Sequence, residues 1–235
     1  MATYNGEPYI AEQLRSILMQ LGENDEVIVA DDNSTDNTCQ IIEDFNDKRI
    51  KLYHTYFRSC KWNFQYALEQ AHGDIIFLSD QDDVWLENKV EKCVQALQIA
   101  DLVVTDSKLT DEKLEVINSS FFTIYHSGKG IIKNSMNNTY YGSCMAFHTD
   151  LLKDALPLPK TDEIGHDIWL GLVAELTGRK VIFLDEALML YRRHDGTRTE
   201  TTDIWHRSKR SIWIKVWSRI VVLYYIIKFK YHHAR

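Results

Sequence analysis

The chain has 235 residues, of which 45% are hydrophobic and 26% are charged. This length and balance are typical of a globular domain with a full core, and they exclude a disordered chain. The net charge of −7 is unevenly spread, because residues 204–235 hold eight Lys or Arg and no Asp or Glu. The rest of the chain therefore carries −15, which argues against nucleic acid as a partner.

Four cysteines are widely spaced and include no C-x-x-C pair: Cys39, Cys60, Cys93 and Cys144. This spacing argues against a zinc knuckle or a disulfide scaffold and favours reduced thiols. Asn5 and Glu7 interrupt any apolar start, so no signal peptide is expected. We expect a cytoplasmic protein.

Strands and helices alternate in the first half of the chain. Apolar runs predict strands at 27–30, 50–53, 74–78 and 102–104. Helical patterns predict helices between them, at 35–45, 63–71 and 87–99. This alternation predicts an α/β fold with a doubly wound, mostly parallel sheet.

The second half is less regular. Strands are expected at 141–147 and 181–184, with a helix between them at 168–177 that ends at Gly178. A single long helix is expected from Ile204 onward. The sequence therefore predicts one domain over residues 1–203 and a basic, aromatic helical segment over 204–235.

Carboxylates gather directly after two of the predicted strands. Asp31 and Asp32 end the first of them, and Asp80, Asp82 and Asp83 follow the third. Ligands of open parallel sheets bind at the carboxyl ends of the strands. Crowded carboxylates there favour a hard divalent cation, and Mg²⁺ or Mn²⁺ suits a diphosphate. Helix capping is the alternative explanation.

Three motifs carry a resemblance to a known family: residues 1–6 (MATYNG), 31–36 (DDNSTD) and 80–85 (DQDDVW). In this order they resemble the family 2 glycosyltransferases with the GT-A fold, and most of all bacterial rhamnosyltransferase-like members that build surface polysaccharides. Weaker similarity continues through 142–147, 166–169 and 191–194, to about residue 200. The resemblance implies a Rossmann-like nucleotide-binding half, an acceptor-binding half and transfer of a sugar from a nucleoside diphosphate to a hydroxyl.

The resemblance assigns the donor nucleotide to the first motifs. Thr3, Tyr4 and Asn5 match the loop that holds the base, and Asp31 or Asp32 matches the carboxylate that binds base or ribose. Asn33 stands where the family usually has glycine, and asparagine tolerates the left-handed backbone of such a turn.

Residues 80–82 match the family's D-x-D motif, which places a divalent metal on the donor diphosphate. Asp82 is the expected direct ligand, with Asp80 and Gln81 nearer the nucleotide. His194 matches a histidine that reaches the metal or the diphosphate in some relatives. A hydrogen-bonded surface histidine is the alternative.

Asp167 matches the family's catalytic base, which would take the acceptor proton in a single displacement that inverts the anomeric carbon. The alternative for Asp167 is a helix N-cap. His166 and Trp169 are candidates for the acceptor sugar, although Trp169 could equally be core. Arg192 and Arg193 could bind phosphate oxygens.

Two departures bear on these expectations. Met1 falls inside the first strand, which is therefore expected to be very short. The chain has no Q-x-x-R-W motif, so one sugar per encounter is expected rather than processive synthesis.

The basic segment is rich in aromatic residues, and five of its apolar residues share one helical face: Trp213, Trp217, Ile220, Tyr224 and Ile227. The longest uncharged run, 220–227, is too short to span a bilayer. We expect an amphipathic helix that binds an anionic membrane surface, with packing on the acidic body as the alternative.

The sequence thus predicts a metal-dependent inverting glycosyltransferase on the inner face of the cell membrane. Its donor would be dTDP-rhamnose or a UDP-hexose, and its acceptor a carbohydrate or a lipid-linked saccharide. A nucleotidyltransferase is the second hypothesis, but no Gly-rich phosphate loop follows the first strand. An inactive membrane-surface protein on the same fold is the third.

Overall fold

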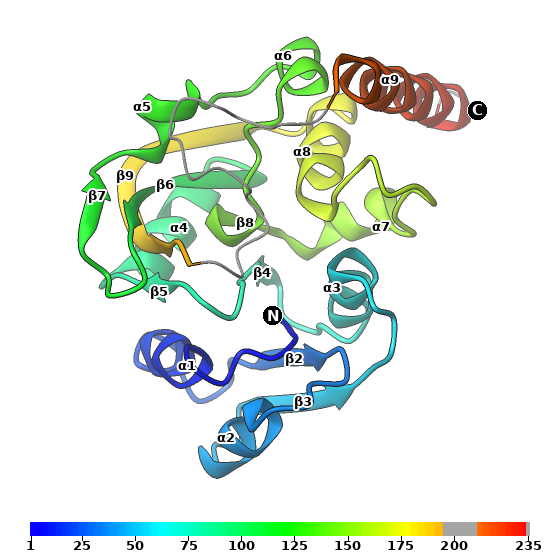
Figure 1. Ribbon diagram of the computed structural model, residues 1–235. Helices are drawn as coiled ribbons and strands as arrows, with labels where there is room; N and C mark the ends of the chain where they lie inside the picture. Colours follow the sequence, from blue (N-terminus) through cyan, green and yellow to red (C-terminus); the bar gives the residue numbers. More distant parts are fainter. Residues whose placement is uncertain (195–210, 234–235) are drawn as a thin grey trace.

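The computed structural model describes residues 1–194 and 211–233 (Figure 1). The predicted helical residues 204–210 lie outside this part of the chain. A first sheet contains three parallel strands in spatial order: β1 (Ala2–Thr3), β2 (Val27–Asp31) and β3 (Ile50–His54). The strands predicted at 27–30 and 50–53 are confirmed, and β1 has two residues, as expected from the position of Met1.

A second sheet has six strands, of which five lie in spatial order: β4 (Ile75–Phe77), β8 (Met145–His148), β6 (Leu102–Thr110), β9 (Val181–Arg192) and β5 (Val84–Trp85). The sixth strand, β7 (Val116–Asn118), pairs with β6. Only β6 and β9 run parallel within this sheet. The predicted parallel arrangement of strands is therefore found in the first sheet and in the β6–β9 pair of the second sheet. The other strand pairs of the second sheet are antiparallel.

Nine α-helices lie in the described part of the chain: α1 (Ile10–Leu18), α2 (Thr38–Asp44), α3 (Cys60–Glu69), α4 (Lys89–Leu97), α5 (Phe121–Tyr125), α6 (Ile131–Met136), α7 (Leu152–Ala155), α8 (His166–Leu176) and α9 (Ile212–His233). Short 3-10 turns cover Gly142–Cys144 (η1) and Thr149–Leu151 (η2). The helices predicted at 35–45, 63–71, 87–99 and 168–177 correspond to α2, α3, α4 and α8. The helix α1 was not predicted, although Ile10, Leu14 and Ile17 bury one face at helical spacing.

The core is deepest around α8. Every residue from Ile168 to Ala174 is buried, so this helix is apolar on all sides. It lies between the second sheet and α9 (Figure 1). The Trp169 ring meets the rings of Tyr225 and Phe229 edge-on, with centroids 6.3 and 5.7 Å away. These contacts fix the orientation of α8, whose first turn carries Asp167.

A cavity of about 610 Å³ separates the two sheets. Its lining includes Val27 and Ile28 of β2 and Ile75 and Ile76 of β4. The lining extends past the carboxyl end of β4 to Ser79, but it includes none of the predicted site residues. The cavity is therefore a feature of the packing between the sheets and is not the candidate site.

Candidate functional site

The three motif loops meet at the carboxyl ends of β1, β2 and β4. The Tyr4 N–H donates to Gln81 Oε1 at 2.8 Å, and Gln81 Nε2 donates back to the Tyr4 carbonyl at 3.1 Å. The Asn5 N–H donates to Ser34 Oγ at 2.8 Å. A Cβ on Gly6 would lie 2.5 Å from Gln81 Oε1, so a larger residue there would displace the end of the Gln81 side chain. Residues up to 77 positions apart thus form one surface.

The two aspartates at the end of β2 have different surroundings. Asp31 accepts hydrogen bonds from Thr3 Oγ1 at 2.9 Å and from the Ser34 N–H at 2.8 Å. Asp32 accepts the backbone N–H groups of residues 57, 58 and 59 at 2.6, 3.0 and 2.8 Å. Asp32 therefore holds the loop before α3. Both carboxylates are thus held by the protein, and Asp31 and Asp32 remain equal candidates for nucleotide binding.

The other residues of these loops also occupy defined places. Thr3 is buried, whereas Tyr4 exposes 57% of its surface and could stack on a base. The Asn5 side chain accepts the Thr35 N–H at 2.8 Å. Asn33 has a φ of 63°, in the left-handed region expected for a turn in which asparagine replaces glycine.

The loop after β4 brings together the two residues predicted to hold a metal. Asp82 Oδ2 lies 2.9 Å from His194 Nε2, and the imidazole contacts the Tyr9 ring in a tilted arrangement, with centroids 4.4 Å apart. Asp83 is buried beside them. Its burial, together with the charges of Asp82 and Asp80, raises its pKa well above the usual range. A cation at this loop would relieve that repulsion.

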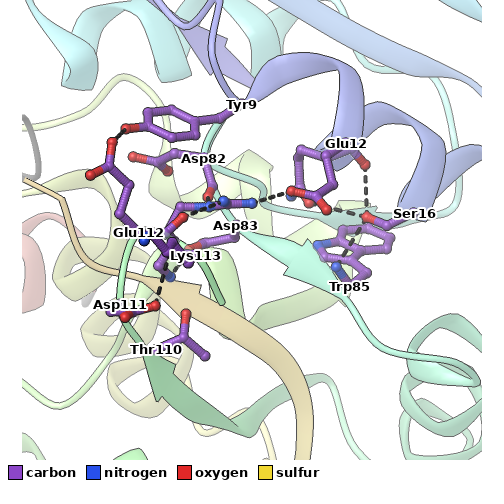
Figure 2. A network of polar contacts seen from close by, with 12 residues as sticks. Tyr9, Glu12, Ser16, Asp82, Asp83, Trp85, Thr110, Asp111, Glu112 and Lys113 are labelled. Atoms are coloured by element: carbon purple, nitrogen blue, oxygen red, sulfur yellow. Dashed lines mark hydrogen bonds and ion pairs between the residues drawn. The ribbon is translucent and has the colours of Figure 1, made fainter. Parts of the chain in front are cut away.

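The Arg192 side chain, predicted to bind phosphate, is instead engaged by the protein. Its guanidinium donates to the Asp82 carbonyl at 2.9 Å, to the Glu112 carbonyl at 2.8 Å and to the Glu12 carboxylate. Its backbone N–H donates to Asp83 Oδ1 at 3.1 Å. Figure 2 shows the labelled partners gathered around this point, with the Tyr9 hydroxyl donating to Glu112. The Arg192 side chain therefore supports the 80–83 loop, in place of the phosphate binding that was expected from the sequence.

Replacing Arg192 with methionine should destabilise the protein, because the buried guanidinium is lost and the Asp82 and Glu112 carbonyls and the Glu12 carboxylate lose their donor at once. We expect the free energy of unfolding to fall by about 3 kcal/mol. Arg193→Met is the matched control, and we expect a smaller change in that variant. Urea unfolding of both variants measures the difference. Equal stabilities for wild type and Arg192→Met would contradict this account of the loop.

A second group of site residues surrounds the start of α8. Asp167 lies in the first turn of α8, and the N-cap residue itself is Gly165, which makes no side-chain cap; part of the capping alternative for Asp167 therefore remains, because its side chain serves an amide of that turn. Its carboxylate accepts the Ile168 N–H at 2.7 Å and faces Asn138 Nδ2 at 3.4 Å. Burial of the carboxyl group raises the pKa of Asp167 to about 6. Such a carboxylate is suited to accept a proton near neutral pH.

The two candidates for binding the acceptor sugar, His166 and Trp169, have different surroundings. His166 stacks on Phe64 with centroids 3.9 Å apart, and a Cβ on Gly142 would lie 2.9 Å from His166 Nε2. Trp169 is buried, and its indole N–H donates to the Ala155 carbonyl at 2.9 Å. Trp169 therefore belongs to the core, and of this pair only His166 remains an acceptor candidate.

The turn η1 connects the two groups. Gly142 lies close to the His166 ring, and the next residue, Ser143, lies close to the Asp83 side chain. The Ser143 carbonyl accepts Lys89 Nζ at 2.8 Å. Residues 142–143 thus lie between the predicted metal loop and the start of α8, which carries the predicted base.

Several residues of the site were missed by the sequence analysis. Tyr9, Glu12 and Glu112 build the Arg192 network, and Gln13 donates to Ser79 Oγ at 2.7 Å. Gln13 was detectable in principle, because a polar residue on the apolar face of a helix needs a buried partner. Glu112 carried no such signal, since a charged residue in a loop is ordinarily solvated.

The fold is that of the GT-A glycosyltransferases, as the solved structures show. Over 94% of this chain and 64% of theirs, it superposes on Staphylococcus aureus TarS residues 1–349 in complex with UDP-GlcNAc, with a TM-score of 0.70 and 21% identity. A mannosyltransferase from Pyrobaculum calidifontis in complex with GDP-Man and Mn²⁺ matches 81% of this chain and 55% of its own, with a TM-score of 0.61 and 20% identity.

Residues 1–156 match glycosyl transferase family 2, and the chain belongs to this family. It is 34% identical to Escherichia coli WfgD, a UDP-Glc:α-D-GlcNAc-diphosphoundecaprenol β-1,3-glucosyltransferase, over 74% of this chain and 68% of the relative. It is 35% identical to the Shigella flexneri dTDP-rhamnosyl transferase RfbG, over 41% of this chain and 36% of the relative.

Proposed function

We propose that this protein is a metal-dependent, inverting glycosyltransferase that transfers a sugar from a nucleoside diphosphate to an acceptor hydroxyl. The observation that carries the proposal is the contact between Asp82 and His194, 2.9 Å apart, beside the junction of the three motif loops. Family membership and the two similar relatives support the same reaction class.

The donor would lie across the carboxyl ends of β1, β2 and β4. Tyr4 offers an exposed ring for the base, and Asp31 or Asp32 offers a fixed carboxylate for base or ribose. Asn5, Asp80 and Gln81 line the same junction. Arg193 stays a candidate for a phosphate oxygen, because the Arg192 guanidinium supports the loop.

A Mn²⁺ or Mg²⁺ ion would be held by Asp82 and His194. These side chains supply a carboxylate and an imidazole, and a diphosphate would supply further oxygen ligands, as is common for such ions. When bound, the metal would supply charge neutralisation at the departing diphosphate.

Asp167 would accept the proton of the attacking hydroxyl. As the acceptor oxygen bonds to the anomeric carbon, the bond to the diphosphate breaks and the hydroxyl proton moves to an Asp167 oxygen. One displacement with one base inverts the anomeric configuration. Asn138 and the Ile168 N–H hold the carboxylate in place, and His166 would position the acceptor sugar.

The substrates are proposed from the relatives. WfgD uses a UDP-hexose and a lipid-linked acceptor, and RfbG is named as a dTDP-rhamnosyl transferase. We therefore expect a UDP-hexose or dTDP-rhamnose as donor and a carbohydrate or lipid-linked saccharide as acceptor, in surface polysaccharide synthesis. The protein should be incubated with GlcNAc-diphosphoundecaprenol and each donor in turn. We expect nucleoside diphosphate to be released from one of the donors, and this release should require Mn²⁺ or Mg²⁺. Release that is unaffected by EDTA would contradict the metal requirement.

The helix α9 supports a membrane surface as a further partner. None of the helices in residues 1–194 and 211–233 has the length and apolarity needed to cross a bilayer. Val222 and Ile226 of α9 are buried against the body, but the aromatic face predicted from the sequence is exposed, with Trp213 at 83% and Trp217 at 59%. The helix carries four Lys or Arg and no acid. We propose peripheral binding at the inner face of the cell membrane.

A double substitution, Trp213→Ala with Trp217→Ala, should abolish cosedimentation of the full chain with vesicles that contain anionic lipid. The body should remain folded, because neither ring is buried. Met19→Ala removes another exposed apolar side chain, 81% exposed on a different helix end, and should leave binding unchanged. Vesicle binding that survives the double substitution would contradict the role of α9.

A further inference from the structure

A cluster of metal-ligand side chains lies at the edge of the first sheet, apart from the Asp82 loop. Asp31, Cys39 and His54 each place one ligand atom so that all three lie within 4.8 Å of one another. Within residues 1–194 and 211–233, no other three residues of these types gather in this way. The donor set is a carboxylate oxygen, a thiol sulfur and an imidazole nitrogen.

The backbone fixes this cluster. Asp31 and His54 are the last residues of β2 and β3, and they are direct neighbours in the parallel register of those strands. Cys39 comes from the first turn of α2, which packs against β3. Cys39 Sγ lies 3.9 Å from His54 Nδ1, and adjacent ligands of a tetrahedral zinc ion are about 3.6 Å apart. The ligands therefore need little movement to meet a metal.

The surroundings also suit a metal site with one open position. Asp31 is fully buried and held by Thr3 and Ser34, so its orientation is set by hydrogen bonds of the kind that orient metal ligands. Cys39 is partly buried, and His54 is exposed, which leaves one side open to solvent. Because burial raises the pKa of the Cys39 thiol to about 12, the sulfur carries its proton before a metal binds.

The ligand chemistry separates this cluster from the Asp82 loop. Thiolate and imidazole ligands select Zn²⁺ over Mg²⁺ and Mn²⁺, which prefer oxygen. We propose that Asp31, Cys39 and His54 form a zinc site whose occupancy excludes the nucleotide of the donor. On binding, a Zn–S bond forms as the S–H bond breaks, and the proton passes to solvent. The exclusion rests on the proposed function, because it assumes that Asp31 contacts the donor nucleotide.

Cobalt reports on the site directly, because a thiolate bound to Co²⁺ gives a charge-transfer absorption in the near ultraviolet. Titration of the full chain with Co²⁺ in excess Mg²⁺ should produce this absorption, and Zn²⁺ should remove it. Cys39→Ser should lack the absorption, whereas Cys60→Ser, which alters another partly buried thiol, should retain it. Absence of the absorption in wild type, or its persistence in Cys39→Ser, overturns the site.

The consequence for the donor is tested separately, by calorimetric titration of UDP and dTDP with Mn²⁺ present. Zinc should weaken nucleotide binding to wild type by about tenfold or more and leave Cys39→Ser unaffected. Equal inhibition of both proteins overturns the exclusion. Failure of both nucleotides to bind zinc-free protein contradicts the proposed function instead, and the cobalt titration still decides the zinc site.

Discussion

Asp167→Asn should lower the rate of sugar transfer by about a thousandfold, because a positioned general base contributes on this scale. The affinity for the donor nucleotide should be unchanged, since Asp167 is placed on the acceptor side. In wild type the rate should rise with pH through about 6 and then level, as the raised pKa of Asp167 requires. Steady-state kinetics across this pH range measures both effects.

The same substitution should stabilise the protein above pH 6. The carboxyl of Asp167 binds its proton more tightly in the folded state, where its pKa is about 6, than at its ordinary value of 3.8. Wild type therefore loses stability as the pH rises between these values, by up to about 3 kcal/mol. Asp167→Asn has no titratable carboxyl group at this position, so its free energy of unfolding should not fall over this pH range for that reason.

Asp162→Asn serves as the matched control, because Asp162 is exposed and lies shortly before α8. It should change neither transfer nor the dependence of stability on pH. Transfer at the wild-type rate by Asp167→Asn would contradict its role as the base.

Asp82→Asn should weaken nucleotide binding in Mn²⁺ by about a hundredfold, close to 3 kcal/mol. Asparagine preserves the size of the side chain and can still hydrogen-bond to His194, so the loss reports the missing charge. In EDTA the variant and the wild type should bind nucleotide equally weakly. Calorimetric titration in both conditions measures the difference.

Asp185→Asn controls for the removal of an acidic charge, because Asp185 is exposed on β9. Its Mn²⁺-dependent affinity should match that of wild type. If Asp82→Asn also binds as wild type does, Asp82 is not a metal ligand.

Buried strands were the part of the fold that the sequence predicted best. Residues 27–30 form a short apolar run, and β2 spans Val27–Asp31, because a strand covered on both faces needs continuous apolar side chains. The strands β5 and β7 were not predicted, since two or three residues carry no usable period. The antiparallel pairing of β8 with β4 and β6 could likewise not be predicted, because it depends on contacts between residues that are far apart in the sequence.

The candidate site was predictable where it consists of local motifs. The loops at 1–6, 31–36 and 80–85 were expected at one edge of a sheet, and the hydrogen bonds of Gln81 and Ser34 join them. The role of Arg192 was not predictable, because its partner Glu12 lies 180 positions away. The cluster of Asp31, Cys39 and His54 also has no spacing motif, since two strand ends and a helix assemble it.

The most direct test of a metal-dependent nucleotide-sugar site is calorimetric titration of the wild-type protein with UDP and with dTDP, in Mn²⁺, in Mg²⁺ and in EDTA. We predict that at least one nucleotide binds, that a divalent metal strengthens the binding and that EDTA removes this gain. The preferred base would also identify the class of donor. Failure of both nucleotides to bind under every metal condition would contradict the proposed function.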